Sequence, residues 1–213
     1  MTKTAVVIGA TGVVGREVVN YLVHSDAYDR VVTLTRRPII SDSHKEENHV
    51  VDFDCLEDVK DLIQGDCFFS CLGTTKKQAG SIAAQRQVDY DYQLRAAELA
   101  AANKMPHYLL VSSSGANAKS FNAYLKMKGE LEQAVEQLPF QSVRIFQPSL
   151  LLGEREDERM GEKIGAAIMP ALCALPGLRK YKPITGKQVA KRMVSESVNE
   201  TSGVSHYVLD EIF

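Results

Sequence analysis

The chain has 213 residues, of which 45% are hydrophobic and 24% are charged, and its formal net charge is −2. This composition predicts a single globular domain over residues 1–213, without the net positive charge that would attract nucleic acid or an anionic membrane. No apolar stretch approaches the roughly 20 residues of a membrane span, and the N-terminal apolar run is too short for a signal peptide, so we expect a cytoplasmic protein without a membrane partner.

The N-terminal stretch predicts a strand, a glycine turn and a helix. Residues 4–8 form a β-branched run typical of a strand buried on both faces, and a helical pattern follows Gly15. Glycines in such a turn allow a sharp bend, close approach of backbone to a pyrophosphate, and tight packing of helix on strand. The helix N-terminus adds N–H groups and a positive dipole end. A purely structural turn is the alternative, but we predict dinucleotide binding at Gly9, Thr11, Gly12, Val13, Val14 and Gly15.

Strands and helices are predicted to alternate up to Ser149. The predicted strands are 30–35, 49–53, 67–72, 107–111, 141–146 and 206–209, and the predicted helices are 56–63, 88–103, 122–138 and 186–199. Residues 41–48 are polar, and residues 73–81 are small and polar, which favours a loop in each segment. The alternation implies right-handed crossovers and an α/β fold, a doubly wound parallel sheet with helices on both faces.

Beyond Ser149 the alternation breaks, which predicts a small C-terminal appendage. We expect residues 150–183 to form a substrate-binding or cover region, because they include an apolar stretch punctuated by Pro170 and Pro176. The same stretch, Ile164 to Leu178, is also suited to a subunit interface, so a monomer and a homodimer both stay open.

Two arginines follow the second predicted strand. NAD-binding units usually carry an acidic residue there to hold the ribose hydroxyls, whereas this chain has Arg36 and Arg37. Guanidinium groups favour a 2′-phosphate, so we predict NADP(H) in preference to NAD(H). An exposed basic turn is the alternative interpretation. Asp52 and Phe53, after the third predicted strand, are candidates for contact with the adenine edge.

The cysteines and histidines show no metal-ligand spacing. The four cysteines, Cys55, Cys67, Cys71 and Cys173, form no C-x-x-C pair, and the five histidines are scattered. We expect Cys67 and Cys71 to be reduced thiols on one face of a buried strand, and we predict no metal site.

Tyr124 and Lys128 are candidate catalytic residues. They lie four apart in a predicted helix and therefore share a face. A nearby ammonium lowers the pKa of a phenol, which suits the pair to proton transfer with a carbonyl or hydroxyl. The pair follows a serine run at the end of a predicted strand, where open α/β sheets bind ligands. One of these serines is expected to hydrogen-bond the substrate oxygen; Ser113 and Ser114 join the catalytic candidates, and Ser112 the cofactor-binding ones.

These motifs together resemble the atypical short-chain dehydrogenases/reductases, and specifically the Tat-interacting-protein-like oxidoreductase branch. The shared segments are 9–15, Arg36-Arg37, 71–75, Ser112-Ser113, 124–130 and 146–151. The resemblance implies a Rossmann fold that binds NADPH, with Tyr124 as acid/base and Lys128 on the nicotinamide ribose. It also implies a cofactor-lining set of Leu72, Gly73, Thr74, Pro148, Leu151 and Arg159.

The chain departs from this family's pattern in three ways. Its glycine spacing is G-x-x-G-x-x-G, which fits extended and atypical members. The asparagine that supports the catalytic lysine in many members has no clear counterpart, Asp89 being the nearest. The region after Ser149 is shorter than in sugar-nucleotide epimerases, which disfavours epimerase or dehydratase activity. The leading hypothesis is an NADP(H)-dependent oxidoreductase acting on an unidentified carbonyl or alcohol, and the alternative is an NADPH-binding regulatory or redox-sensing protein.

Overall fold

The central element is a parallel sheet of seven strands. The computed structural model describes residues 2–152 and 183–212. Spatial strand order is β3-β2-β1-β4-β5-β6-β9, and every neighbouring pair is parallel. The strands are β1 (Lys3–Ile8), β2 (Tyr28–Thr35), β3 (Glu46–Val50), β4 (Cys67–Ser70), β5 (His107–Val111), β6 (Ser142–Gln147) and β9 (Gly203–Val208). The order reverses between β1 and β4, which is where open α/β sheets form a ligand crevice at the carboxyl ends of their strands.

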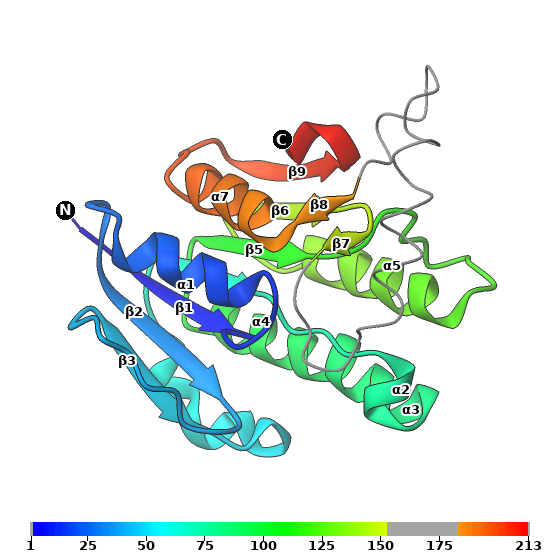
Figure 1. Cartoon of the computed structure of the whole chain (residues 1–213), viewed down its shortest axis with the longest axis horizontal. Coiled ribbons are helices and arrows are strands. Elements are labelled where there is room, and N and C mark those ends of the chain that lie inside the picture. The colour runs from blue at the N-terminus through cyan, green and yellow to red at the C-terminus, as the bar shows by residue number, and fades with distance from the viewer. Residues whose placement is uncertain (1, 153–182, 213) are drawn as a thin grey trace.

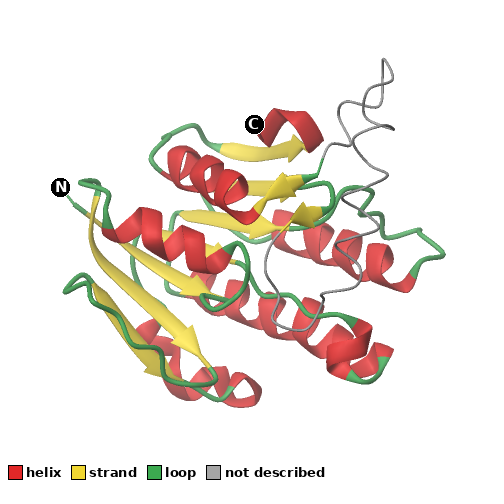
Figure 2. Cartoon of the chain, in the orientation of Figure 1, coloured by secondary structure: helices red, strands yellow, loops and turns green. Residues whose placement is uncertain are grey.

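Helices cover both faces of the sheet (Figure 1). On one face α1 (Gly15–Val23) packs beside α7 (Gly186–Ser197). The other face is covered by the 3-10 segment η1 (Phe53–Leu62) and the helices α4 (Tyr92–Ala102) and α5 (Ala123–Glu136). Figure 2 shows the same layering, with helices on either side of the strands. The predicted α/β class with a doubly wound parallel sheet is confirmed.

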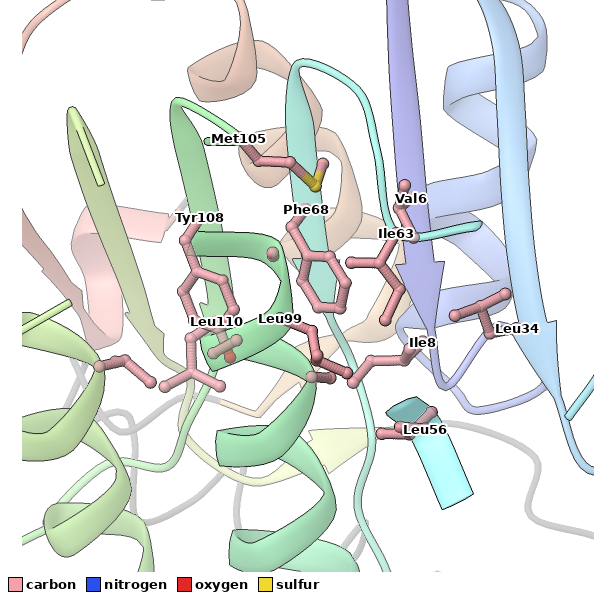
Figure 3. Packing of buried hydrophobic residues seen from close by; sticks show 14 of the residues in the cluster. Val6, Ile8, Leu34, Leu56, Ile63, Phe68, Leu99, Met105, Tyr108 and Leu110 are labelled. Atoms are coloured by element: carbon pink, nitrogen blue, oxygen red, sulfur yellow. The ribbon is translucent and has the colours of Figure 1, made fainter. Parts of the chain in front are cut away.

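Alternating strand residues supply two hydrophobic clusters. Val6 and Ile8 of β1 pack toward η1, α4 and α5, whereas Ala5 and Val7 pack toward α1 and α7. Figure 3 shows the first cluster, in which Phe68 and Tyr108 stack with ring centroids 5.6 Å apart. A fully buried side chain of this size stabilises the fold by about 1.5–3 kcal/mol, so these clusters hold the sheet that positions the carboxyl-end loops.

The third strand lies three residues earlier than predicted. β3 runs from Glu46 to Val50, so part of the predicted loop 41–48 is strand. As an edge strand it is only half-buried, and polar residues such as Glu47 and Asn48 are tolerated there. The apolar pattern at 49–53 was misleading because Phe53 begins η1 and packs into the core.

The segment after β4 is also more helical than predicted. β4 ends at Ser70, so Cys71 and Leu72 lie beyond the strand, and Cys67 and Cys71 do not share a strand face. The predicted loop 73–81 contains the short helix α2 (Lys76–Ala79), and α3 (Ile82–Arg86) precedes the predicted helix at 88–103. The side chains of Thr75 and Ser81 cap these two helices, so serine and threonine N-caps were the available sequence signal.

Two short strands lie on either side of the region that is not described. β7 (Leu151–Leu152) pairs in parallel with β8 (Ile184–Thr185), which joins to α7. The predicted cover region 150–183 is therefore described only at its ends, and residues 153–182 lie outside the described part. After β9, the last described residues form a short 3-10 helix, η4 (Leu209–Ile212). None of the helices in residues 2–152 and 183–212 is both long and apolar enough to cross a membrane.

Candidate functional site

The glycine turn after β1 is built on two close backbone contacts. Gly9 has a φ of +79°, and a Cβ there would lie 2.6 Å from the backbone nitrogen of Leu72. A Cβ on Gly15 would overlap the carbonyl group of Gly9, with 2.7 Å to its carbon. Both glycines are therefore required by the chain's own backbone, which brings α1 against β1 and β1 against the loop after β4.

Gly12 has a different environment. It is exposed, its φ is not in the left-handed region, and a Cβ would meet only the oxygen of Gly9, at 3.3 Å, and that of Cys71, at 3.9 Å. No side chain caps the N-terminus of α1, which begins at Gly15. An exposed glycine with little surrounding it, beside an uncapped helix N-terminus, fits the close approach of a pyrophosphate to the backbone.

The remaining residues of the turn are arranged around this helix start. Thr11 is exposed, Val13 is half-buried and Val14 is buried. A Cβ on Gly186, the first residue of α7, would lie 2.7 Å from a side-chain carbon of Val13. The start of α7 therefore packs directly against the glycine turn. The sequence contained no sign of this contact.

Arg36 and Arg37 lie at the carboxyl end of β2, as predicted. Both are exposed, and within the described residues neither guanidinium takes part in an ion pair. Thr35 donates from Oγ1 to the carbonyl oxygen of Arg37 at 2.7 Å, which fixes the backbone of this turn. Two unpaired guanidinium groups at this position fit an anionic ligand such as a 2′-phosphate.

The two adenine-contact candidates differ in exposure. Asp52 is exposed, and its Oδ1 accepts from the backbone N–H of Asp54 at 2.9 Å, capping η1. Phe53 is only 5% exposed and packs against Tyr92 at a centroid distance of 5.6 Å. The ring of Phe53 is therefore mainly a core residue and leaves little surface for an adenine contact.

The loop after β4 lies between the glycine turn and α5. The backbone N–H of Cys71 donates to the oxygen of Ile8 at 3.0 Å, and Leu72, Gly73 and Thr74 follow. Burial raises the pKa of the Cys71 thiol to about 12, and the charge of Lys128 only partly offsets this. Cys71 is thus a protonated packing residue at neutral pH.

Two contacts hold the helix that carries Tyr124 and Lys128, one just before Tyr124 and one just after Lys128. Asn122 caps α5 by accepting from the backbone N–H groups of Tyr124 and Leu125, at 3.0 and 3.2 Å. Further along, a Cβ on Gly129 would lie 2.6 Å from Cα of Asn117, so only glycine allows this close approach of α5 to the loop after β5. Tyr124 is half-buried, whereas Lys128 is 2% exposed.

The ammonium of Lys128 lies at the end of β5. Nζ donates to the carbonyl oxygen of Val111 at 3.3 Å and is 3.5 Å from Oδ1 of Asp89. Val111 directly precedes the serine run. The ammonium of Lys128 therefore lies next to these serines, at the carboxyl end of β5. Asp89, named from the sequence only as the nearest match to a supporting asparagine, is a direct partner of Lys128.

The serine run adjoins the end of β6. Ser112 is 4% exposed, its N–H donates to the oxygen of Phe146 at 2.7 Å, and within the described residues its Oγ has no hydrogen-bond partner. Ser113 and Ser114 are half-buried, and the N–H of Ser114 donates to the oxygen of Pro148 at 2.9 Å. Leu151 lies in β7, and Arg159 is outside the described residues. An orphaned, buried hydroxyl beside two accessible ones fits a polar ligand at this edge.

Three residues that matter for this geometry were not predicted as site residues. They are Asp89, which contacts Lys128, and the packing glycines Gly129 and Gly186. Gly129 stood within the shared segment 124–130, which was a usable signal. The roles of Asp89 and Gly186 depend on contacts between residues far apart in the chain, which no local pattern records.

Comparison with known proteins shows the family of the chain. A family model described as NAD(P)H-binding matches residues 9–163. Protein HTATIP2 of Rattus norvegicus is 37% identical over 164 residues, which cover 75% of this chain and 67% of that protein. Protein FMP52, mitochondrial, of Candida glabrata is 38% identical over 209 residues, covering 93% of this chain and 86% of that protein.

Solved structures show the same fold at low identity. A short chain dehydrogenase family protein from Francisella tularensis aligns with a TM-score of 0.71 and 14% identity, over 97% of both chains. MoeE5 in complex with UDP-glucuronic acid and NAD aligns with a TM-score of 0.73 and 15% identity, over 97% of this chain and 76% of MoeE5. At these identities the likeness concerns the fold alone.

Proposed function

Because the chain belongs to the NAD(P)H-binding, atypical short-chain dehydrogenase/reductase family, we propose that it is an NADP(H)-dependent oxidoreductase acting on a carbonyl or alcohol. The observation that carries the proposal is the intact pair of Tyr124 and Lys128 on α5. The lysine is buried against the end of β5, next to the serine run. A phenol, an ammonium and hydroxyl groups thus come from segments at the carboxyl edge of the sheet. The glycine turn after β1 lies at the same edge.

A nicotinamide dinucleotide, when bound, supplies or accepts a hydride. The residues of this chain would bind and orient it: the backbone around Gly12 and the start of α1 at the pyrophosphate, and Lys128 at the nicotinamide ribose. Tyr124 would give a proton to the substrate oxygen in reduction and take it back in oxidation. Ser113 or Ser114 would hold that oxygen by a hydrogen bond.

The preference for NADP(H) over NAD(H) is part of this proposal. It rests on Arg36 and Arg37, which are exposed at the end of β2 and make no ion pair within residues 2–152 and 183–212. A 2′-phosphate would give them a charge-assisted partner, whereas the ribose hydroxyls of NAD(H) would not.

The test begins with binding and continues with turnover. The protein is titrated with NADPH and NADH by calorimetry, and NADPH absorbance is then followed with a panel of small aldehydes, ketones and quinones. Oxidation of NADPH by one substrate class in the wild-type protein, and its loss in the Tyr124→Phe variant, are expected. Tight NADPH binding with no turnover on the panel, together with a partner whose binding depends on NADPH, would favour a regulatory protein instead.

Compartment and assembly are open to direct measurement. We propose a cytoplasmic location, and the names of the FMP52 relatives, which contain the word mitochondrial, make a mitochondrial location the alternative. Cell fractionation would test the location, and sedimentation equilibrium would decide between a monomer and a homodimer.

A further inference from the structure

The side chain of Asn48 contacts the polar groups at the end of β2. Asn48 is on the edge strand β3, which lies beside β2 (Figure 1), and it is half-buried opposite Thr33. Its Nδ2 donates to Oγ1 of Thr33 at 3.0 Å and to Oγ1 of Thr35 at 2.9 Å. The carbonyl oxygen of Thr33 is a third acceptor, at 3.3 Å. One amide group on the edge strand is therefore directed at two buried hydroxyl groups of the neighbouring strand.

The same side chain also holds the segment that follows the two arginines. Oδ1 of Asn48 accepts from the backbone N–H of Ile39 at 3.0 Å. Ile39 is partly buried and packs against the hydrophobic cluster on the α1 side of the sheet. Pro38 precedes it, and a proline fixes its own φ and keeps the residue before it extended. Asn48 thus joins the end of β2 to the chain on the far side of the arginines.

Thr35 extends this contact to the backbone of Arg37. Its one hydroxyl hydrogen is donated to the carbonyl oxygen of Arg37 at 2.7 Å, so the same oxygen is free to accept from Asn48. The carbonyl oxygen of Thr35 accepts from the N–H of Val51 at 2.9 Å. Arg36 therefore lies between two residues whose backbones are both held by hydrogen bonds.

We propose that Asn48 is a positioning residue for the preference for NADP(H). Through Thr35 and Ile39 it holds the backbone that carries Arg36 and Arg37 in one conformation. A turn that is already ordered loses less conformational freedom when its side chains bind a phosphate. This inference rests on the proposed preference for NADP(H) and adds to it a residue of another strand, which acts through the turn without touching the cofactor.

The chemistry of the contact requires a side-chain amide. It must accept from the N–H of Ile39 and donate to the hydroxyl of Thr35 at once, and of the groups of this shape only an amide does both. Asn48→Leu has nearly the same shape and removes both contacts. Thr35→Val removes the hydroxyl and keeps the branched side chain, whereas Thr35→Ser keeps the hydroxyl.

The experiment measures the affinities of the intact protein for NADPH and NADH by calorimetry. It compares the wild-type protein with Asn48→Leu, Thr35→Val and Thr35→Ser, and thermal unfolding checks that each variant is folded. A further readout needs no cofactor: hydrogen exchange of the Ile39 amide, followed by NMR. Because Asn48→Leu and Thr35→Val interrupt the same contact at different points, either folded variant suffices for the test.

Asn103→Leu is the matched control. Asn103 follows α4, and its Nδ2 donates to the carbonyl oxygens of Lys60 and Ile63 at 2.8 and 2.7 Å. It is thus another side-chain amide that connects two segments of the chain, but it has no contact with the turn at Arg36. Asn103→Leu should lower the melting temperature and leave the ratio of the two affinities unchanged.

Asn48→Leu and Thr35→Val are each expected to lower the ratio of NADPH affinity to NADH affinity about three- to tenfold, the range for ordering one or two more groups on binding. The affinity for NADH should stay within about twofold of wild type, since NADH has no 2′-phosphate. Thr35→Ser should keep the wild-type ratio. Exchange of the Ile39 amide in Asn48→Leu should be about three- to tenfold faster, because its hydrogen bond is lost.

A double-mutant cycle shows whether Asn48 acts through the arginines. In a protein that already carries Arg36→Ala and Arg37→Ala, adding Asn48→Leu should not change the affinity ratio further. A further change there, or an equal loss of affinity for both cofactors in Asn48→Leu, would show a purely structural role and overturn the inference.

Two further outcomes separate this inference from the proposed function. A wild-type preference for NADPH that is unchanged in Asn48→Leu and Thr35→Val would overturn the role of Asn48 alone. Equal affinities for the two cofactors in the wild-type protein would overturn the proposed preference and this role together, whatever the exchange rate of the Ile39 amide.

Discussion

The backbone of Gly9 and the Cα of Gly15 are so close that no side chain fits between them. A Cβ on Gly15 would lie 2.7 Å from the carbonyl carbon of Gly9, whereas one on Gly12 would make a tight contact at 3.3 Å with the oxygen of Gly9. The three glycines of one motif therefore have separate physical roles. Gly9 and Gly15 are needed for the fold, whereas Gly12 is exposed and is the glycine that we propose to face the cofactor.

This difference predicts opposite outcomes for two substitutions. Gly15→Ala should destabilise the protein by about 1–3 kcal/mol, because α1 must move away from β1 to relieve the overlap. Gly12→Val should leave the melting temperature nearly unchanged and abolish NADPH binding, because its side chain would fill the space beside the uncapped helix end. Thermal unfolding and calorimetric titration of both variants check this. Normal affinity in a folded Gly12→Val protein would contradict the ligand role.

The double variant Arg36→Ala/Arg37→Ala tests the cofactor preference. A charge-assisted hydrogen bond to phosphate contributes roughly 1.5–3 kcal/mol, so the wild-type protein should bind NADPH about ten- to a hundredfold more tightly than NADH. The double variant should lose most of that preference while its affinity for NADH changes little. Arg30→Ala is the matched control, because Arg30 is an exposed arginine of β2, the strand that precedes Arg36, and it already pairs with Glu47. Equal affinities for the two cofactors in the wild-type protein would refute the assignment.

Tyr124→Phe removes one hydroxyl group and keeps the ring, so packing should be preserved. Turnover should fall by ~10²–10⁴ while NADPH affinity stays within a few-fold of wild type, since a positioned proton donor contributes about this much to the rate. Stopped-flow and steady-state measurement of NADPH oxidation check this, and equal rates in the two proteins would remove Tyr124 from the mechanism.

Lys128→Met should behave differently from Tyr124→Phe. It should weaken NADPH binding as well as turnover, because Lys128 is assigned to the ribose and to the phenol. It should also lower stability by about 3–5 kcal/mol, because the buried carboxylate of Asp89 would lose its partner cation. Unfolding in urea and NADPH titration measure the two effects. Unchanged NADPH affinity in a folded Lys128→Met protein would argue against the ribose contact.

His107 predicts a pH dependence of stability. It is buried in β5, its Nδ1 is 2.8 Å from Oγ of Ser142, and burial, assisted by the charge of Arg144, lowers its pKa below the ordinary value of 6.5. A folded-state pKa that is lowered means that the unfolded chain takes up the proton first, so this contribution is complete above about pH 6.5 and is lost as pH falls. His107→Asn, which can keep the contact with Ser142, should flatten the fall in unfolding free energy below pH 6.5. An unchanged slope would show that other groups cause it.

The elements that the sequence predicted well are strands that contain a run of buried residues. β1, β2 and β5 are apolar runs inside the sheet, and their positions agree with prediction to within two residues. β3 was misplaced because an edge strand tolerates polar side chains and so lacks the apolar run that marks a buried strand. The π turn at 87–91 was missed because one extra residue in a helix leaves no mark on composition.

By itself, the sequence determined the order of strands and helices, the glycine turn, the two arginines after β2 and the spacing of Tyr124 and Lys128. All of these are local, because each depends on residues that are neighbours in the chain. Only the tertiary structure decided which glycine is free to face a ligand, that Phe53 packs into the core, and that Asp89 contacts Lys128. These facts depend on how the elements pack against one another in three dimensions, and a local sequence pattern does not record packing.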